Sequence, residues 1–568
     1  MSNKHNRSGK SRRLAIVGAG VTGSSFLSFL IGRLRGSQIK CKMEIHIFEG
    51  SGEFGTGLPY KTNLPVTCLL NQPNDYMGWI APEDPYAGPE DYVQYLQKNA
   101  DTLAEQYDCL DVSSLKDPKG YTPRFIYGQY LKEGFLKIES LAKLLGIHLI
   151  KHAVCVKEIR VMGKTAELTY QENSQLVTTE FENVILTTGH WGSEFLEELS
   201  ETGRFFPVYP VEPLRNKDVF TGKRVAVIGT GLSGIDAAFT LIKSGVQKVI
   251  MTSRQGWLRA IKCPISKYHR RFFTKQVVDD IFEEQGYITL QQVTDLFLQE
   301  YNVALNTCRG YQQNPEQYKD DAWSCYVGQN FYVADNHPDA KDFLTPDDAV
   351  ERLKYHIHET ESCPSHKGVL WRSILASFYE KVDGFLAFGD YIYQRMQNED
   401  KSEYMKKIYK VGINFHASMP LSSAKRLLNF YQQDQLEILK GFKSIAFDVD
   451  SCSLKMEMND GESIYVDYVV DATNQSRDLN DHPLYGQLIE DGSAVKHPAG
   501  GISIELNTYK LLDKNGYPSS VLRTVGPILH GSTYTIKAFD SLGDVESTKH
   551  IAEQIHAELV QDLAVAAV

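Results

Sequence analysis

The sequence of 568 residues contains no C-x-x-C pair, no excess of positive charge and no long apolar run without polar interruptions. Its nine cysteines are scattered and odd in number, which argues against a redox enzyme with paired cysteines and favours reduced thiols. A net charge of -11 disfavours nucleic acid or an anionic membrane as a partner of the whole surface. These absences predict a cytoplasmic protein without stable membrane association.

The N-terminal region has a basic segment followed by an apolar one, an order also found in signal peptides. The apolar stretch over residues 14–31 is interrupted by Gly18, Gly20, Gly23 and several serines. A strand, a turn and a helix therefore explain it better than a membrane span. A mass of 64.1 kDa exceeds what one hydrophobic core usually supports, so two or more domains are expected.

Two segments share a strand-turn-helix pattern with glycines at fixed spacing. In the first, the apolar run 13–17 leads into Gly18, Gly20 and Gly23. In the second, the run 224–228 leads into a turn with four characteristic residues, namely Gly229, Gly231, Ser233 and Gly234. In such turns the glycines permit a tight bend and a close backbone approach to a pyrophosphate, which lies at the helix N-terminus. Two dinucleotide sites in one chain predict a bound flavin and a nicotinamide dinucleotide.

The residues that follow the next strand of each segment differ in charge. The strand predicted over residues 43–49 ends on Glu49, which can accept hydrogen bonds from ribose hydroxyls of FAD or can be an ordinary charged strand end. The strand 248–252 is followed by Ser253 and Arg254. Arg254 can pair with a 2′-phosphate, which favours NADPH, or can be a surface arginine.

Two further apolar runs, 183–189 and 468–474, read as buried strands, and the first enters a turn with Thr188 and Gly189. From about residue 257 to 440 the sequence changes to helical patterns with many aromatic residues. One helix is expected to begin with Thr345 as its N-cap and Pro346 in its first turn. His356 and His358 stand two apart on a predicted helix and so form a poor metal pair. No metal site is expected.

Many short motifs along the chain together resemble the bacterial FAD-NAD(P)-binding family. They are Gly18–Gly23, Gly55–Tyr60, Leu69–Asn71, Pro123–Leu131, Thr187–His190, Gly229–Gly234, Ser253–Arg254, His416–Pro420, and Gly526–Pro527 followed by Gly531. The resemblance implies that Gly57, Tyr60, Leu70 and Asn71 line the flavin. It also implies that Val156 lies near the adenine and that Asp471 and Gly526 complete the FAD site.

Members of this family include amine-oxidising monooxygenases such as aspartate N-monooxygenases, and the architecture is similar to that of ornithine and lysine N-hydroxylases. The F-x-G-x-x-x-H fingerprint is absent from residues 205–215, which makes a Baeyer–Villiger enzyme doubtful. Arg124 can bind a substrate carboxylate or can be a structural ion-pair partner. His190 and His416 can shuttle protons or can be structural histidines.

The sequence thus predicts an α/β protein with two Rossmann-like domains, one for FAD and one for NADPH, and a mostly helical insertion. The FAD domain is expected over residues 1–205 and 441–568, and the NADPH domain over 206–440 with its insertion at about 257–440. The favoured reaction is oxygenation of the amino nitrogen of a small amino acid or amine by molecular oxygen through a C4a-peroxyflavin. A flavin dehydrogenase or reductase and a nucleotide-sensing interaction protein are the open alternatives.

Overall fold

Contacts within the chain divide it into two units. The computed structural model describes residues 12–37, 43–78, 90–107, 110–189, 195–262, 271–300, 348–362, 385–405, 417–473, 479–480, 482–533 and 545–566. Unit 1 comprises residues 1–66, 72–191 and 476–568, and unit 2 comprises residues 67–71 and 192–475.

The centre of unit 1 is a seven-stranded sheet in the order β16-β17-β18-β7-β1-β2-β3. Five of these strands are parallel, and β16 and β17 form an antiparallel edge. The strands are β1 (Arg12–Val17), β2 (Met43–Phe48), β3 (His148–His152), β7 (Asn183–Leu186), β16 (Ile504–Glu505), β17 (Lys510–Leu512) and β18 (Pro518–Thr524). The last four residues of β1 are buried, as expected for a parallel strand covered on both faces.

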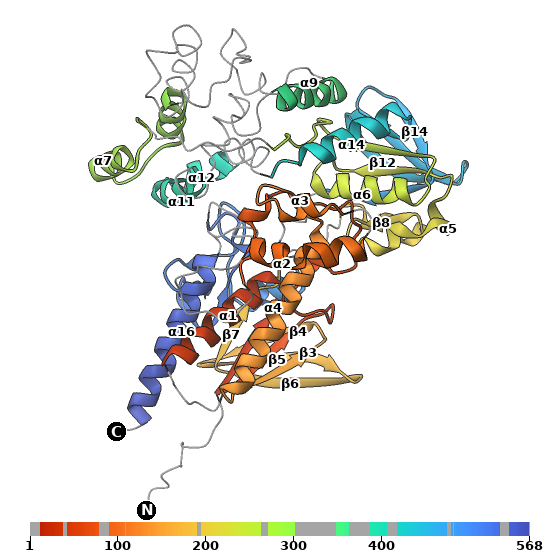
Figure 1. The fold of residues 1–568 in the computed structure, drawn as a ribbon. Coiled ribbons are helices and arrows are strands. Elements are labelled where there is room, and N and C mark those ends of the chain that lie inside the picture. The colour runs from red at the N-terminus through yellow and green to blue at the C-terminus, as the bar shows by residue number, and fades with distance from the viewer. Residues whose placement is uncertain are drawn as a thin grey trace, which may run out of the picture. The chain divides into compact units, whose positions relative to one another are not determined.

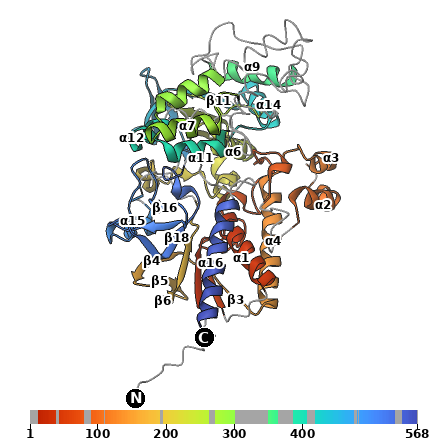
Figure 2. The same ribbon diagram turned by 90° about the vertical axis from the view of Figure 1, so that its left-hand side faces the viewer.

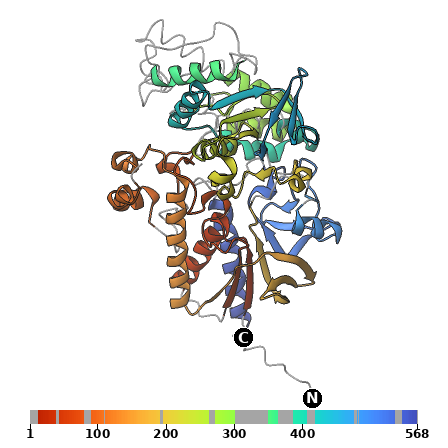
Figure 3. The same cartoon turned by 90° about the vertical axis from the view of Figure 1, so that its right-hand side faces the viewer.

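Helices of unit 1 come from distant parts of the sequence. Helix α1 (Val21–Ser37) contacts both α4 (Arg124–Leu144) and α16 (Val545–Ala566), and Figure 2 shows α1 and α16 side by side. Serines on α1 permit this approach, since Ser25 Oγ lies 3.0 Å from Thr548 Oγ1. In Figure 3 the blue α16 again runs beside the red N-terminal elements.

Smaller elements complete unit 1. A three-stranded antiparallel sheet follows β3, and short helices lie in the connections. These elements are β4 (Val156–Met162), β5 (Thr165–Glu172), β6 (Gln175–Phe181), η1 (Leu58–Tyr60), η2 (Asn74–Tyr76), α2 (Tyr92–Gln106), α3 (Val112–Lys116), α15 (Pro483–Glu490) and η9 (Pro527–Leu529).

Unit 2 contains a five-stranded parallel sheet in the order β11-β10-β9-β15-β8. A three-stranded antiparallel sheet, β12-β13-β14, precedes β15 in the chain. The strands are β8 (Phe205–Pro207), β9 (Arg224–Ile228), β10 (Lys248–Ser253), β11 (Leu436–Lys440), β12 (Phe442–Asp448), β13 (Ser453–Met458), β14 (Ser463–Val466) and β15 (Tyr468–Asp471). The contact-defined unit thus runs on past the predicted limit at residue 440, through β12 to β15.

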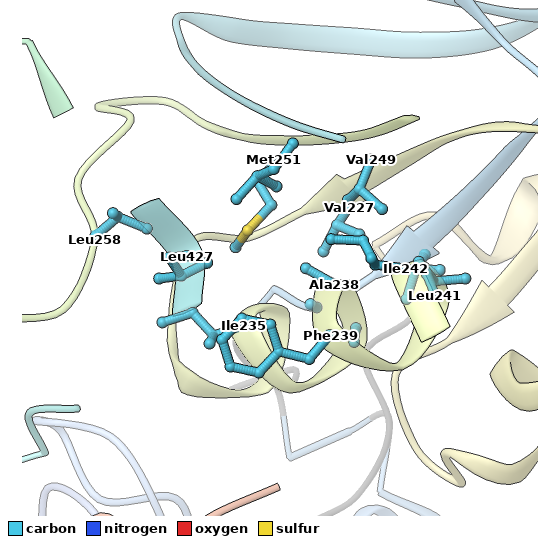
Figure 4. Close-up of a cluster of buried hydrophobic side chains, with 14 of the residues drawn as sticks. Val227, Ile235, Ala238, Phe239, Leu241, Ile242, Val249, Met251, Leu258 and Leu427 are labelled. Atoms are coloured by element: carbon cyan, nitrogen blue, oxygen red, sulfur yellow. The ribbon is translucent and has the colours of Figure 1, made fainter. Parts of the chain in front are cut away.

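Helix α6 (Leu232–Lys243) packs on the parallel sheet of unit 2 through an apolar cluster (Figure 4). Ile235, Ala238 and Phe239 of α6 and Val227 and Met251 of the strands are buried members of this cluster. Fixing α6 against β9 and β10 also fixes the turn between β9 and α6.

Further helices of unit 2 are η3 (Glu197–Thr202), η4 (Glu212–Arg215), α5 (Lys217–Phe220), α7 (Lys275–Gln285), α9 (Ala349–Ser362), α11 (Phe385–Arg395), α12 (Asn398–Tyr404) and α14 (Leu421–Gln432), and residues 290–300 are helical as well. Most of them fall within residues 257–440 and appear as separate helices in Figure 1. The predicted fold class, two parallel sheets with dinucleotide turns and a helical portion, is confirmed. Within the described part of the chain, no helix has the length and apolarity needed to cross a membrane.

Candidate functional site: two dinucleotide turns

The first glycine turn connects β1 to α1 in unit 1. Gly18 has φ 106° and its N–H donates to the carbonyl oxygen of Phe48 at 2.9 Å. A Cβ at Gly18 would lie 2.2 Å from the carbonyl oxygen of Thr187, and a Cβ at Gly23 would lie 2.1 Å from that of Gly18. Only glycine fits at these two positions. The turn therefore brings the N-terminus of α1 to the carboxyl ends of β1 and β7, where a dinucleotide phosphate binds in this fold.

Glu49 is held at this turn by three hydrogen bonds to its carboxylate. One carboxylate oxygen accepts from the N–H of Ala19 at 3.0 Å, and the other accepts from the N–H and Oγ of Ser51 at 3.1 and 2.8 Å. The backbone N–H of Glu49 donates to the carbonyl oxygen of His152 at 2.9 Å, which extends the pairing of β2 and β3. The acid is thus oriented beside the first fingerprint, as a ribose-binding acid must be.

The loop of residues 55–60 packs between the first turn and α4. The N–H of Gly55 donates to the carbonyl oxygen of Ala19 at 2.7 Å, and a Cβ at Gly20 would lie 3.2 Å from Cα of Gly57. At its other end, the rings of Tyr60 and Tyr127 meet edge to face at 5.0 Å. Gly57 and Tyr60, which the family resemblance implied, therefore lie on a segment packed directly against the fingerprint.

Four more predicted cofactor residues belong to unit 1, and three of them follow strands of its large sheet. Thr188 and Gly189 follow β7, and Gly526 follows β18 with φ 111°. The N–H of Val525 donates to the carbonyl oxygen of Leu186 at 3.1 Å, so these two strand ends are adjacent. Val156 is the first residue of β4. The preceding residue, Cys155, packs against Gly50, the residue after Glu49, since its Sγ would lie 2.3 Å from a Cβ there.

The second glycine turn, in unit 2, repeats the geometry of the first. Gly229 has φ 121° and its N–H donates to the carbonyl oxygen of Thr252 at 2.7 Å. A Cβ at Gly229 would lie 2.2 Å from the carbonyl oxygen of Ala472, and a Cβ at Gly234 would lie 2.1 Å from that of Gly229. Gly231 is the N-cap of α6 and Ser233 lies in its first turn, so the N-terminus of α6 can take an anion.

The strand that follows this turn ends without an acid. Ser253 Oγ lies 3.1 Å from Thr230 Oγ1 and accepts from the N–H of Gly256 at 2.9 Å, which ties the strand end to the turn. Arg254 comes next and its side chain is exposed. A cation at this place suits a 2′-phosphate, whereas Glu49 at the equivalent place in unit 1 suits a free ribose.

Three residues that the resemblance implied for the FAD site belong to unit 2 by their contacts. Leu70 is buried and Asn71 is partly exposed, and both lie in the segment 67–71. Asp471 ends β15, next to β9. One of its carboxylate oxygens accepts from the N–H and Oγ1 of Thr473 at 2.9 and 2.6 Å, and the other has no hydrogen-bond partner among the described residues. Their assignment to FAD stays a prediction.

The candidate catalytic residues are Arg124, His190 and His416. Arg124 is partly buried and is the first residue of α4, directly after Pro123. The first turn of α4 contains no acidic residue, so a carboxylate bound there would be stabilised by both the guanidinium and the helix N-terminus. His190 and His416 lie outside the described residues.

Sequence reasoning missed two residues at the second turn. Trp257 is anchored there because Thr230 Oγ1 donates to its carbonyl oxygen at 2.5 Å. The Nε atom of Arg259 lies 4.0 Å from the position of a Cβ at Gly231. The only available signal was a second arginine five residues after Arg254, since the sequence does not reveal that the loop returns to the turn.

The match to a known family covers the first of these turns. Residues 15–191 match the model of a family described as FAD-NAD(P)-binding. Flavin-containing monooxygenase 5 of Cavia porcellus is 25% identical over 257 residues, which are 44% of this chain and 41% of that protein. Trimethylamine monooxygenase of Pelagibacter ubique (strain HTCC1002) is 25% identical over 260 residues, 43% of this chain and 51% of that protein. The chain therefore matches only about half, or less, of the length of these relatives.

A solved structure supports the fold of the described residues. The reduced form of ornithine hydroxylase from Pseudomonas aeruginosa aligns with 97% of this chain and 100% of its own, with a TM-score of 0.53 and 12% sequence identity. At this identity the likeness shows the fold alone.

Proposed function

We propose that the whole chain is an FAD-dependent, NADPH-using monooxygenase. The proposal starts from the match of residues 15–191 to the FAD-NAD(P)-binding family. Its substrate is the amino group of a small amino acid or a related amine. The observation that carries the proposal is the pair of matching glycine turns, with a fixed acid beside the first and an exposed arginine beside the second. One chain with both turns is built to pass electrons from a nicotinamide to a flavin.

The residues of the first turn fit FAD. The close approach of Gly20 to Gly57 leaves backbone on both sides without side chains, and the Glu49 carboxylate offers an acceptor to a ribose hydroxyl. When bound, NADPH supplies hydride and FAD stores the electrons and activates oxygen. The tasks of the chain are to hold both nucleotides, to orient the substrate and to exclude water.

Arg124 supports an amino acid as the substrate class. Its place at the N-terminus of α4 combines a planar cation with the positive end of the helix dipole, which together favour a carboxylate. Oxygen transfer requires an uncharged, nucleophilic nitrogen, so a substrate fixed by its carboxylate can present its amine after loss of a proton. In this proposal Arg124 anchors the substrate and takes no proton itself, since arginine stays charged.

The test is a product screen with the FAD-loaded chain, NADPH and oxygen. Amino acids and polyamines are supplied one at a time, and hydroxylamine and nitroso products are measured by mass spectrometry beside hydrogen peroxide release. An oxygenated amine in yield close to NADPH consumption supports the proposal. Peroxide alone with every amine overturns it, and efficient reduction of an added electron acceptor would then identify a flavin dehydrogenase or reductase.

Arg124→Ala tests the anchor separately. We expect a higher KM for an acidic amino acid with nearly unchanged reduction of the flavin by NADPH, because substrate binding alone is weakened. The loss of a charge-assisted bond corresponds to about 1.5 to 3 kcal/mol. Arg124→Lys, which keeps the charge without the planar fork, is the matched control, and an unchanged KM in Arg124→Ala contradicts the anchoring role.

A further inference from the structure

The loop after β10 returns to the second glycine turn and is fixed on both sides of Arg259. On one side, the carbonyl oxygen of Trp257 accepts from Thr230 Oγ1 at 2.5 Å, and Thr230 stands between the first two glycines of the turn. On the other side, the N–H of Met419 donates to the carbonyl oxygen of Ala260 at 2.8 Å, and the N–H of Lys262 donates to that of Met419 at 2.7 Å. The backbone that carries Arg259 is therefore held before any ligand binds.

Arg259 lies beside the second glycine of the turn. Its Nε atom is 4.0 Å from the position that a Cβ of Gly231 would take, and this glycine is where the backbone comes closest to the pyrophosphate in such turns. Gly231 is also the N-cap of α6 and has no side chain to accept from the first N–H groups of the helix. The guanidinium and the positive end of α6 thus converge on the same place, and an anion there would be stabilised by both.

Arg254 occupies a different place. It follows the last residue of β10 and is exposed, whereas Arg259 lies at the turn between β9 and α6. A nicotinamide dinucleotide phosphate likewise has two distinct anionic groups, the pyrophosphate and the 2′-phosphate. The first is common to NADH and NADPH, and the second is found in NADPH alone.

We propose that Arg259 binds the pyrophosphate of the nicotinamide dinucleotide and that Arg254 recognises the 2′-phosphate. This inference depends on the proposed function, which requires that unit 2 bind NADPH. It divides affinity from selectivity: Arg259 strengthens the binding of both nucleotides, and Arg254 distinguishes between them. Arg259 is a binding residue and takes no part in bond making or breaking.

The test is an equilibrium binding experiment on the FAD-loaded full chain with four ligands. NADPH has both anionic groups, NADH and ADP-ribose have only the pyrophosphate, and adenosine 2′-monophosphate has only the 2′-phosphate. Arg259→Ala should weaken NADPH, NADH and ADP-ribose alike, by about ten- to a hundredfold, and leave adenosine 2′-monophosphate unchanged. Arg254→Ala should weaken only the two ligands that carry the 2′-phosphate.

Two further variants serve as controls. Lys243→Ala removes an exposed cation from the opposite end of α6 and should change no dissociation constant. Arg259→Gln keeps most of the side-chain stem, so a loss of affinity that it shares with Arg259→Ala reports the charge and not packing. FAD content and circular dichroism establish that each variant is folded.

The outcomes separate the two proposals. If the unmodified chain binds no nicotinamide dinucleotide, the proposed function fails. If it binds NADPH and Arg259→Ala leaves all four affinities unchanged, the assignment of Arg259 is wrong and the function stands. If Arg259→Ala weakens only the ligands with a 2′-phosphate, the roles of the two arginines are reversed and the assignment is again wrong.

Discussion

The two glycine turns have nearly the same backbone and different neighbours. The first glycine of each approaches a carbonyl oxygen of the adjacent strand end, Thr187 or Ala472, so closely that a Cβ would lie 2.2 Å away. Beside the first turn a carboxylate accepts from a backbone N–H of the turn, and beside the second turn a serine hydroxyl and arginines take its place. The glycines therefore define a dinucleotide site, and the residues after the next strand define which dinucleotide.

Valine at the second glycine gives the largest expected difference between the turns. Gly20→Val should abolish FAD binding, because its Cβ would lie only 3.2 Å from Cα of Gly57 and would strain the turn itself. A Cβ at Gly231 would meet only Arg259 Nε, at 4.0 Å, so Gly231→Val should fold and keep FAD. It should lose NADPH, because the valine side chain would stand where the pyrophosphate approaches the backbone. FAD absorbance after gel filtration and NADPH titration measure the two losses. Full NADPH affinity in Gly231→Val would contradict the assignment of the second turn to NADPH.

Arg254→Ala tests the role of the cation that follows β10. Removing the cation should weaken NADPH by about 1 to 3 kcal/mol and leave NADH nearly unchanged. The ratio of the two dissociation constants, measured by titration, reports the effect. Equal losses for both nucleotides would mean that Arg254 contacts something common to them, contrary to its assignment.

Glu49→Gln tests the acid beside the first turn and should have a smaller effect. Glutamine keeps the shape and one carbonyl acceptor but lacks the charge, so FAD affinity should fall by about 1 kcal/mol through weaker hydrogen bonds. NADPH affinity should not change. The dissociation constant for FAD, obtained by reconstitution of the apoprotein, is the measurement. A greater loss of NADPH than of FAD would contradict the assignment of the two turns.

Local patterns were predicted well because glycine spacing after an apolar strand is a property of a few consecutive residues. The strands β1 and β9 and both turns lie where the sequence indicated. The pairing of β7 with β1 and of β15 with β9 depends on contacts between residues far apart in the chain. The sequence pattern therefore predicted these strands but not which strands are adjacent in the sheet. The same limit concealed Arg259, whose place depends on how a loop returns.

Helix boundaries show a second limit. The N-cap of the helix near residue 350 was predicted at Thr345, which lies outside the described residues together with Pro346. Helix α9 begins at Ala349, and Asp348 acts as its cap, since its carboxylate accepts from the N–H groups of Val350 and Glu351 at 2.8 and 2.9 Å. Several residues in this segment have side chains that can cap, and sequence alone does not choose among them.

Acid should destabilise unit 1. His482 caps α15: its Nδ1 accepts from the N–H groups of Leu484 and Tyr485 at 3.2 and 3.4 Å. Burial lowers the pKa of His482 from 6.5 to about 4. Burial and the neighbouring His152 lower that of His46 in β2 to about 4 as well. Tyr485 in turn bonds Thr524 of β18 at 2.6 Å, two residues before Gly526, so α15 is coupled to the predicted FAD site.

These histidines bind protons more weakly in the folded than in the unfolded chain, so their stability contribution is present above pH 6.5 and falls as the pH decreases toward 4. His482→Asn replaces the nitrogen acceptor by an oxygen that does not titrate. It should keep stability at pH 7 within about 1 kcal/mol, the usual value of a cap, and lose less stability than the unmodified chain between pH 7 and 5. Urea unfolding, monitored by the release of FAD at both pH values, measures this difference. Since His46 still titrates in the variant, part of the acid sensitivity should persist; an unchanged dependence on pH would show that protonation of His482 does not loosen α15.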